Sequence, residues 1–137
     1  MRAVLDPNVL VSALLSPTGA PARALREWVE GRYELVVSPR LLAELARVLA
    51  YPKLRSRVEP HDAEQLVDWL ARQAILAVDP ADPPSRVADA NDDYLLALAA
   101  GEDAFLVSGD KHLLALADEF PIFSPPRFLE RFELHPD

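Results

Sequence analysis

Four acidic residues, Asp6, Glu44, Asp92 and Asp110, adjoin apolar segments that can place them near one another. Asp6 and Asp110 each follow a short apolar run, Asp92 precedes an apolar helical pattern, and Glu44 lies near the apolar face of another helix. Crowded carboxylates repel one another, so their pKa values rise unless a cation is bound. Hard divalent cations prefer oxygen ligands. The set is therefore typical of metal-dependent phosphodiester hydrolysis.

Two of these acids also suit simpler roles. Asp6 precedes a helix and Asp is a common N-cap residue, so capping alone would explain it. Glu44 has helix-spaced basic neighbours in Arg40 and Arg47, and ion pairing alone would explain it. The residue types leave both roles open.

Other catalytic schemes fit the sequence poorly. There is no Cys, which excludes a cysteine nucleophile, thiolate metal sites and disulfides. The three His show no metal-ligand spacing, and no glycines flank a serine as in a nucleophile elbow. With only four Gly the chain has no phosphate-binding glycine loop.

The charge is unevenly distributed along the 137 residues, whose net charge is −8. Residues 20–57 hold eight basic and four acidic residues, a net charge of +4, which leaves −12 for the rest. A locally basic face can bind a phosphate backbone on an acidic protein. We also expect a single domain over residues 1–137, with no membrane span or signal peptide and a cytoplasmic location.

Short apolar runs alternate with helical patterns along the chain. We expect strands at residues 3–5, 34–37, 75–78, 104–107 and 121–123. Helices are expected at residues 9–15, 21–30, 39–49, 62–73 and 94–100, after residue 110, and from 124 toward 132. Residues 51–54 should break the third helix, and residues 79–85 should be an irregular loop. The alternation predicts an α/β fold with a central parallel sheet covered on both faces, a three-layer α/β/α sandwich.

Four segments together resemble the PIN-domain ribonucleases, of the kind found as the toxin of toxin–antitoxin pairs. They are Val-Leu-Asp-Pro-Asn-Val-Leu-Val-Ser-Ala-Leu-Leu (4–15), Ser-Pro-Arg-Leu-Leu-Ala-Glu-Leu (38–45), Asp-Asp-Tyr-Leu-Leu-Ala-Leu-Ala-Ala (92–100) and Phe-Leu-Val-Ser-Gly-Asp-Lys-His-Leu-Leu (105–114). The resemblance implies an acidic quartet that binds Mg²⁺ or Mn²⁺ and cleaves RNA. It places the first acid on Asp6, the helix acid on Glu44 and the last on Asp110.

The third acid of the family pattern falls on Asp92, counted back from the small-residue helix at Leu98. Asp93 is the second choice, and Asp89 is assigned to the preceding loop. The family's usual Thr or Ser after the first Asp is Pro7 here, which removes one hydroxyl.

Supporting roles are implied for three further residues. Asn8, Ser108 and Asp93 would hold the carboxylates in place, and Ser108 keeps the hydroxyl that the family places two residues before its last Asp.

The resemblance also implies partners. These are an RNA substrate, a small antitoxin laid as a helix or strand across the acidic groove, and a second copy of the chain. Trp28 or Phe128 would contribute to a dimer only if exposed, and a core position is the favoured interpretation for both.

Two alternatives stay open from sequence. One is a receiver-like Mg²⁺-binding signalling module, which would need an acceptor Asp at the end of a central strand mid-chain. The other is a PIN fold that has lost catalysis and serves as a protein-binding scaffold.

Overall fold

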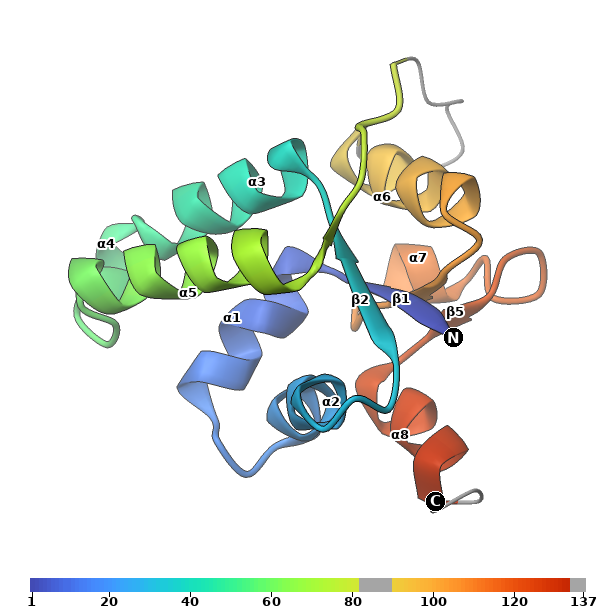
Figure 1. Cartoon of the computed structure of the whole chain (residues 1–137), viewed down its shortest axis with the longest axis horizontal. Helices are drawn as coiled ribbons and strands as arrows, with labels where there is room; N and C mark the ends of the chain where they lie inside the picture. The colour runs from blue at the N-terminus through green and yellow to red at the C-terminus, as the bar shows by residue number, and fades with distance from the viewer. Residues whose placement is uncertain (82–89, 134–137) are drawn as a thin grey trace.

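A five-stranded parallel sheet forms the centre of the protein, as the computed structural model shows for residues 1–81 and 90–133 (Figure 1). The strand order is β3-β2-β1-β4-β5. The strands are β1 (Arg2–Leu5), β2 (Glu34–Val37), β3 (Ile75–Leu76), β4 (Phe105–Val107) and β5 (Ile122–Phe123). All neighbouring strands are parallel, as the alternating pattern predicted.

Helices connect the strands and cover both faces of the sheet. They are α1 (Pro7–Leu15), α2 (Ala20–Val29), α3 (Pro39–Leu49), α4 (Pro52–Arg55), α5 (Pro60–Gln73), α6 (Ala90–Gly101), α7 (Lys111–Leu114) and α8 (Pro125–Glu133). In Figure 1 the strands run between α6 and α7 and the pair formed by α2 and α8. α6 packs on β1 and β4, while α2 packs against α1 and α8. The predicted three-layer α/β/α architecture is confirmed.

Local signals account for where several helices begin and end. The Ser38 hydroxyl accepts a hydrogen bond from the Leu41 N–H at 3.2 Å, and Pro39 occupies the first position of α3, as predicted. Gly31 lies in the turn that follows α2 and has a φ of +81°. This backbone conformation is costly for residues with a Cβ, so glycine suits the position.

The structure differs from the expectation in two places and leaves a third expectation untested. Residues 51–54 do break α3, but the chain then forms the short helix α4, since proline is tolerated in a first helical turn. The strand expected over 75–78 is shortened to β3 at the sheet edge. Residues 82–89, which include most of the predicted proline loop and Asp89, lie outside the described residues.

The core lies between the sheet and its helices. Ala3, Val4 and Leu5 of β1 are at most 1% exposed, as expected for a central strand buried on both faces. Phe128 of α8 is fully buried and packs edge-on against Tyr33, with ring centroids 5.1 Å apart. Trp28 is half-buried and packs against Trp69, with ring centroids 5.0 Å apart. The preference for a core position is thus confirmed for Phe128, which offers no surface to a dimer, while Trp28 is only partly buried.

None of the helices in the described ranges combines the length and apolar character needed to cross a membrane. The cytoplasmic location stays a prediction.

Candidate active site

Three neighbouring strands end in buried polar residues at one edge of the sheet. Asp6 follows β1, Ser38 follows β2 and Ser108 follows β4; Asp6 is 5% exposed and both serines are fully buried. The Asp6 N–H donates to the Val107 carbonyl at 2.9 Å, which fixes β1 against β4 where both strands end. Open parallel sheets bind ligands at this carboxyl edge.

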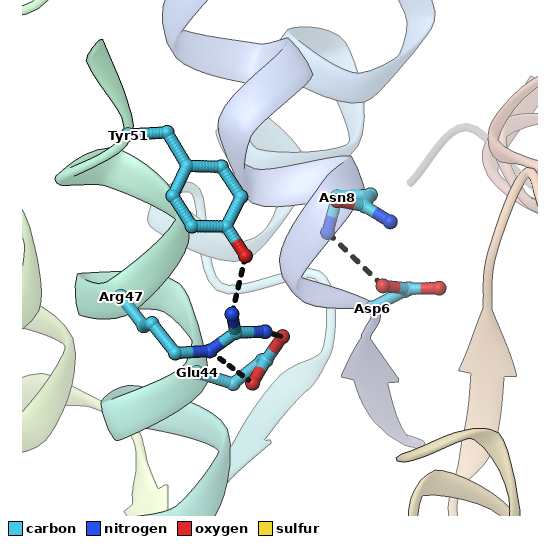
Figure 2. A network of polar contacts seen from close by, with 5 residues as sticks. All are labelled: Asp6, Asn8, Glu44, Arg47 and Tyr51. Atoms are coloured by element: carbon cyan, nitrogen blue, oxygen red, sulfur yellow. Dashed lines mark hydrogen bonds and ion pairs between the residues drawn. The ribbon is translucent and has the colours of Figure 1, made fainter. Parts of the chain in front are cut away.

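Both oxygens of Asp6 accept hydrogen bonds. Oδ1 accepts from the backbone N–H of Asn8 at 3.0 Å, a bond drawn in Figure 2. Oδ2 accepts from the Ser108 hydroxyl at 2.8 Å. The first bond makes Asp6 the N-cap of α1, so the capping role considered from sequence is present. The second bond turns the carboxylate toward the β4 end. Asp6 therefore caps a helix and also belongs to the polar edge of the sheet.

Ser108 links Asp6 to Asp110. Its hydroxyl oxygen accepts from the Asp110 N–H at 3.0 Å while its proton is donated to Asp6. Asp110 Oδ1 in turn accepts from the His112 N–H at 2.7 Å and caps α7. The His112 ring lies 3.3 Å from the same oxygen, but its side chain is 80% exposed. Ser108 thus links the two strand-end acids by hydrogen bonds, in line with the supporting role that the family resemblance implies for it.

A hollow of about 310 Å³ opens beside these residues. We call it the acidic hollow; it is lined by Asp6, Asn8, Val9, Ser12, Pro21, Gly109, Asp110 and Pro125. The polar side chains around it, two carboxylates, one amide and one hydroxyl, offer oxygen atoms as ligands. It lies where α1 and α7 begin, so the helix caps also line the hollow.

The surroundings of Asp6 raise the pKa of its carboxyl. Burial raises its pKa above the usual value of 3.8, and hydrogen bonds from Asn8 and Ser108 lower it. The negative charges of Asp110 and Glu44 raise the pKa further. Three of the four predicted acids therefore interact electrostatically. A cation bound in the hollow would favour the ionised form of Asp6.

Glu44 lies on α3 beside this cluster and is bound by Arg47. Arg47 Nε donates to Glu44 Oε2 at 3.1 Å and Nη2 to Oε1 at 2.5 Å, while Nη1 donates to the Tyr51 hydroxyl (Figure 2). The helix-spaced ion pair considered from sequence is therefore present. Its existence does not remove Glu44 from the cluster, because the charge of Glu44 acts on Asp6.

Asp92 and Asp93 are buried in the first turn of α6, at 8% and 6% exposure. The next residue, Tyr94, ties this turn to the end of β2, since its hydroxyl lies 2.9 Å from the Ser38 hydroxyl. The Arg40 guanidinium covers the Tyr94 ring at 4.3 Å. α6 therefore begins at the same sheet edge as the other acids. Sequence reasoning missed this contact of Tyr94. The available signal was that Tyr94 carries the one hydroxyl in the apolar run 94–100.

The acidic hollow fits a hydrated Mg²⁺ or Mn²⁺ better than a cation enclosed by protein ligands. Within residues 1–81 and 90–133, no three Asp, Glu or His side chains gather closely enough to hold one ion together. Mg²⁺ commonly binds through one or two carboxylates and keeps several waters. Asp6 and Asp110, with the oxygens of Asn8 and Ser12 nearby, match that requirement.

The basic residues of 20–57 are mostly exposed, but several are already paired. Arg23 lies 3.3 Å from Glu133 and Arg32 lies 3.8 Å from Glu27. The exposed Lys53, Arg55 and Arg57 follow α3 on and after α4.

One relative is similar to this chain in sequence, and several solved structures are similar to it in fold. The chain is 26% identical to the uncharacterized protein MJ1680 of Methanocaldococcus jannaschii, over 97% of this chain and 92% of that protein. It superposes on PAE2754 from Pyrobaculum aerophilum with a TM-score of 0.64 and 20% identity, covering 98% of this chain and 90% of the other.

Two further similar structures are of VapBC proteins. VapBC2 from Rickettsia felis, bound to a DNA fragment from their promoter, gives a TM-score of 0.62 at 16% identity, covering 90% of this chain and 98% of the other. VapBC-1 from nontypeable Haemophilus influenzae gives a TM-score of 0.64 at 14% identity, covering 92% of this chain and 99% of the other. At such identities the likeness establishes the fold alone.

The family model described as PIN domain matches residues 2–112. This match spans well over half of the chain and includes Asp6, Glu44, Asp92 and Asp110. The chain therefore belongs to the PIN domain family.

Proposed function

We propose that the protein is a Mg²⁺- or Mn²⁺-dependent endoribonuclease. The observation that carries the proposal is the Asp6 carboxylate, which is buried yet lines the acidic hollow together with Asp110. Burying a carboxylate beside other negative charges is unfavourable, so the arrangement favours a cation as part of the working site. PIN family membership supports a nuclease.

The acids would divide the work. Asp6 and Asp110 would hold the cation directly or through water, and Asp92, in the first turn of α6, would reach it only through a bound water. Glu44 would bind the cation or orient the attacking water. When bound, a divalent cation lowers the pKa of water and stabilises charge on the leaving oxygen.

Three residues would support the acids. Asn8 orients Asp6 through its N–H, Ser108 connects Asp6 to Asp110, and Asp93 would support the start of α6.

The RNA backbone would be held by exposed basic residues that follow the end of α3. Lys53, Arg55 and Arg57 are exposed in a span of positive net charge. Phosphate contacts of this kind release counterions, so binding should weaken as salt rises.

The protein would work as the toxin of a toxin–antitoxin pair. The fold likeness to VapBC2 from Rickettsia felis and VapBC-1 from nontypeable Haemophilus influenzae supports an antitoxin partner for this chain. The antitoxin would lay a helix or strand across the acidic hollow and so block RNA. A homodimer is part of the same proposal.

The alternatives lose support to different degrees. In a receiver-like sheet the third strand lies inside the sheet next to the first, whereas here β3 is at the edge. β2 also ends in Ser38 rather than in an acceptor Asp. A PIN scaffold without catalysis differs from the main proposal only in activity.

The test is cleavage of a fluorescent single-stranded RNA pool with Mg²⁺, Mn²⁺ or EDTA. We expect metal-dependent cleavage by the wild type and its loss in Asp6→Asn. Asp62→Asn is the matched control, because Asp62 is an exposed acid in the first turn of α5. Retained Mg²⁺-dependent cleavage in Asp6→Asn would refute the site assignment. No cleavage by the wild type under any metal would favour the scaffold.

A further inference from the structure

The Glu44–Arg47 pair poses a question about the role of Glu44. Arg47 binds both Glu44 oxygens, Nε to Oε2 and Nη2 to Oε1. A fork of two parallel hydrogen bonds fixes a carboxylate in orientation as well as in position. Glu44 nevertheless lies near the acidic hollow, because α3 packs against α1, the helix that Asp6 caps, and Figure 2 draws both acids in one close view. An acid of the site is thus held by a cation that belongs to the protein itself.

Arg47 is in turn held by Tyr51. The remaining terminal nitrogen, Nη1, donates to the Tyr51 hydroxyl, and the guanidinium carbon lies 5.4 Å from the Tyr51 ring centre. Residues 44, 47 and 51 are spaced three and four apart, so they follow one stripe of α3 and its end (Figure 2). Each of the three guanidinium nitrogens therefore donates one hydrogen bond within the stripe. This leaves Arg47 no hydrogen-bonding nitrogen that does not already have a partner in the stripe.

The paired state changes what Glu44 can offer. A carboxylate whose two oxygens are both bound by an arginine is partly compensated, so it competes less well for a second cation. Each oxygen nevertheless keeps a lone pair that can accept a proton from water. The sequence leaves two roles for Glu44, metal ligand or water-orienting group, and the observed pairing distinguishes between them.

We propose that Arg47, anchored by Tyr51, is a positioning residue that holds Glu44 beside the cation site, where it orients the attacking water rather than binding the metal. This inference rests on the proposed nuclease function and assigns one residue within it. Arg47 acts through Glu44 and touches neither the cation nor the RNA.

The test compares Arg47→Gln and Arg47→Lys in the wild-type and Glu44→Gln backgrounds. Mn²⁺ affinity is measured from the electron paramagnetic resonance signal of free Mn²⁺, and cleavage is resolved into kcat and KM. The affected side chains are exposed or partly exposed, so the fold should persist, and thermal melts check this. Tyr51→Phe removes only the anchoring hydroxyl.

We expect Arg47→Gln to bind Mn²⁺ roughly threefold or more tightly, because Glu44 loses its compensating charge and becomes available as a ligand. Its kcat should fall about tenfold or more with KM unchanged, since the water-orienting group is no longer held. Arg47→Lys keeps the charge but not the fork, so kcat should fall while Mn²⁺ affinity stays constant. Tyr51→Phe should lower kcat by a smaller factor. In the Glu44→Gln background all these effects should vanish.

Two results would overturn the inference. Weaker Mn²⁺ binding by Arg47→Gln would make Glu44 a metal ligand that needs Arg47. A rise in KM in both backgrounds would mean that Arg47 contacts RNA directly. If the wild type cleaves no RNA, the proposed function fails, and the Mn²⁺ measurement alone decides about Arg47. Glu44-dependent tightening would then support the positioning role, and unchanged affinity would reject it.

Discussion

Replacing Ser108 with Ala should reveal how much one hydroxyl does at the polar edge of the sheet. Ser108 is fully buried, donates to Asp6 Oδ2 at 2.8 Å and accepts from the Asp110 N–H at 3.0 Å. A hydrogen bond to a charged group contributes about 1.5–3 kcal/mol, and an N–H left without a partner costs about 1 kcal/mol more. We therefore expect Ser108→Ala to lose about 2–4 kcal/mol of unfolding free energy at neutral pH.

The loss should depend on pH. Burial already raises the folded-state pKa of Asp6, and the Ser108 hydroxyl lowers it, so the substitution raises this pKa further. A group whose folded pKa lies above its unfolded value contributes stability that is complete below the unfolded pKa and is lost as pH rises through the folded pKa. The gap between Ser108→Ala and wild type should therefore be smallest near pH 4, where the cost of the unpaired Asp110 N–H remains, and should widen toward pH 7.

Urea unfolding with EDTA at several pH values measures this gap without bound metal. Ser38→Ala is the matched control, because Ser38 is also fully buried and bonded to Tyr94 and to the Leu41 N–H, but not to a carboxylate. Burial raises the pKa of Tyr94 to about 12, so this control should show a loss that is constant from pH 4 to 8. An equal loss for Ser108→Ala at pH 4 and pH 7 would refute the electrostatic explanation and leave packing as the cause.

Three further predictions concern the core, a turn and the basic span. Phe128→Ala should cost about 3–5 kcal/mol in urea unfolding, because it empties a fully buried aromatic position; a loss below 1 kcal/mol would contradict this packing. Gly31→Ala should cost about 1–2 kcal/mol in the same assay, since φ is +81° there and a Cβ is strained in that region, and an unchanged midpoint would argue against the turn. Arg55→Gln with Arg57→Gln should lower the slope of log RNA affinity against log salt by about 1–2, measured by fluorescence anisotropy; an unchanged slope would place the RNA elsewhere.

Most of the fold could be predicted from sequence because its signals are local. Ser38 and Pro39 mark the start of α3, Gly31 marks the end of α2, and buried apolar runs identify β1 and β2. Proline produced the main local difference, since Pro52 both ended one helix and began another.

The sequence predicts candidate residues for the site, but it does not predict their contacts. Strand-end positions suggested that Asp6 and Asp110 meet, and Ser108 does connect them. The bond between Ser38 and Tyr94 joins residues 56 positions apart, and no local pattern reveals such a pairing. Helix capping and a place in the site are also not exclusive alternatives for Asp6. Its carboxylate has two oxygens and caps α1 with only one of them.

The most direct test of the central claim is the chemistry of the cut RNA ends. Cleavage with Mg²⁺ in H₂¹⁸O should leave a terminal phosphate monoester that carries one solvent oxygen, because water is the proposed nucleophile at the acidic hollow. Mass spectrometry of a short oligonucleotide measures this directly. Products ending in a 2′,3′-cyclic phosphate, formed as readily with EDTA as with Mg²⁺, would contradict the account, since the ribose hydroxyl would then attack without any metal.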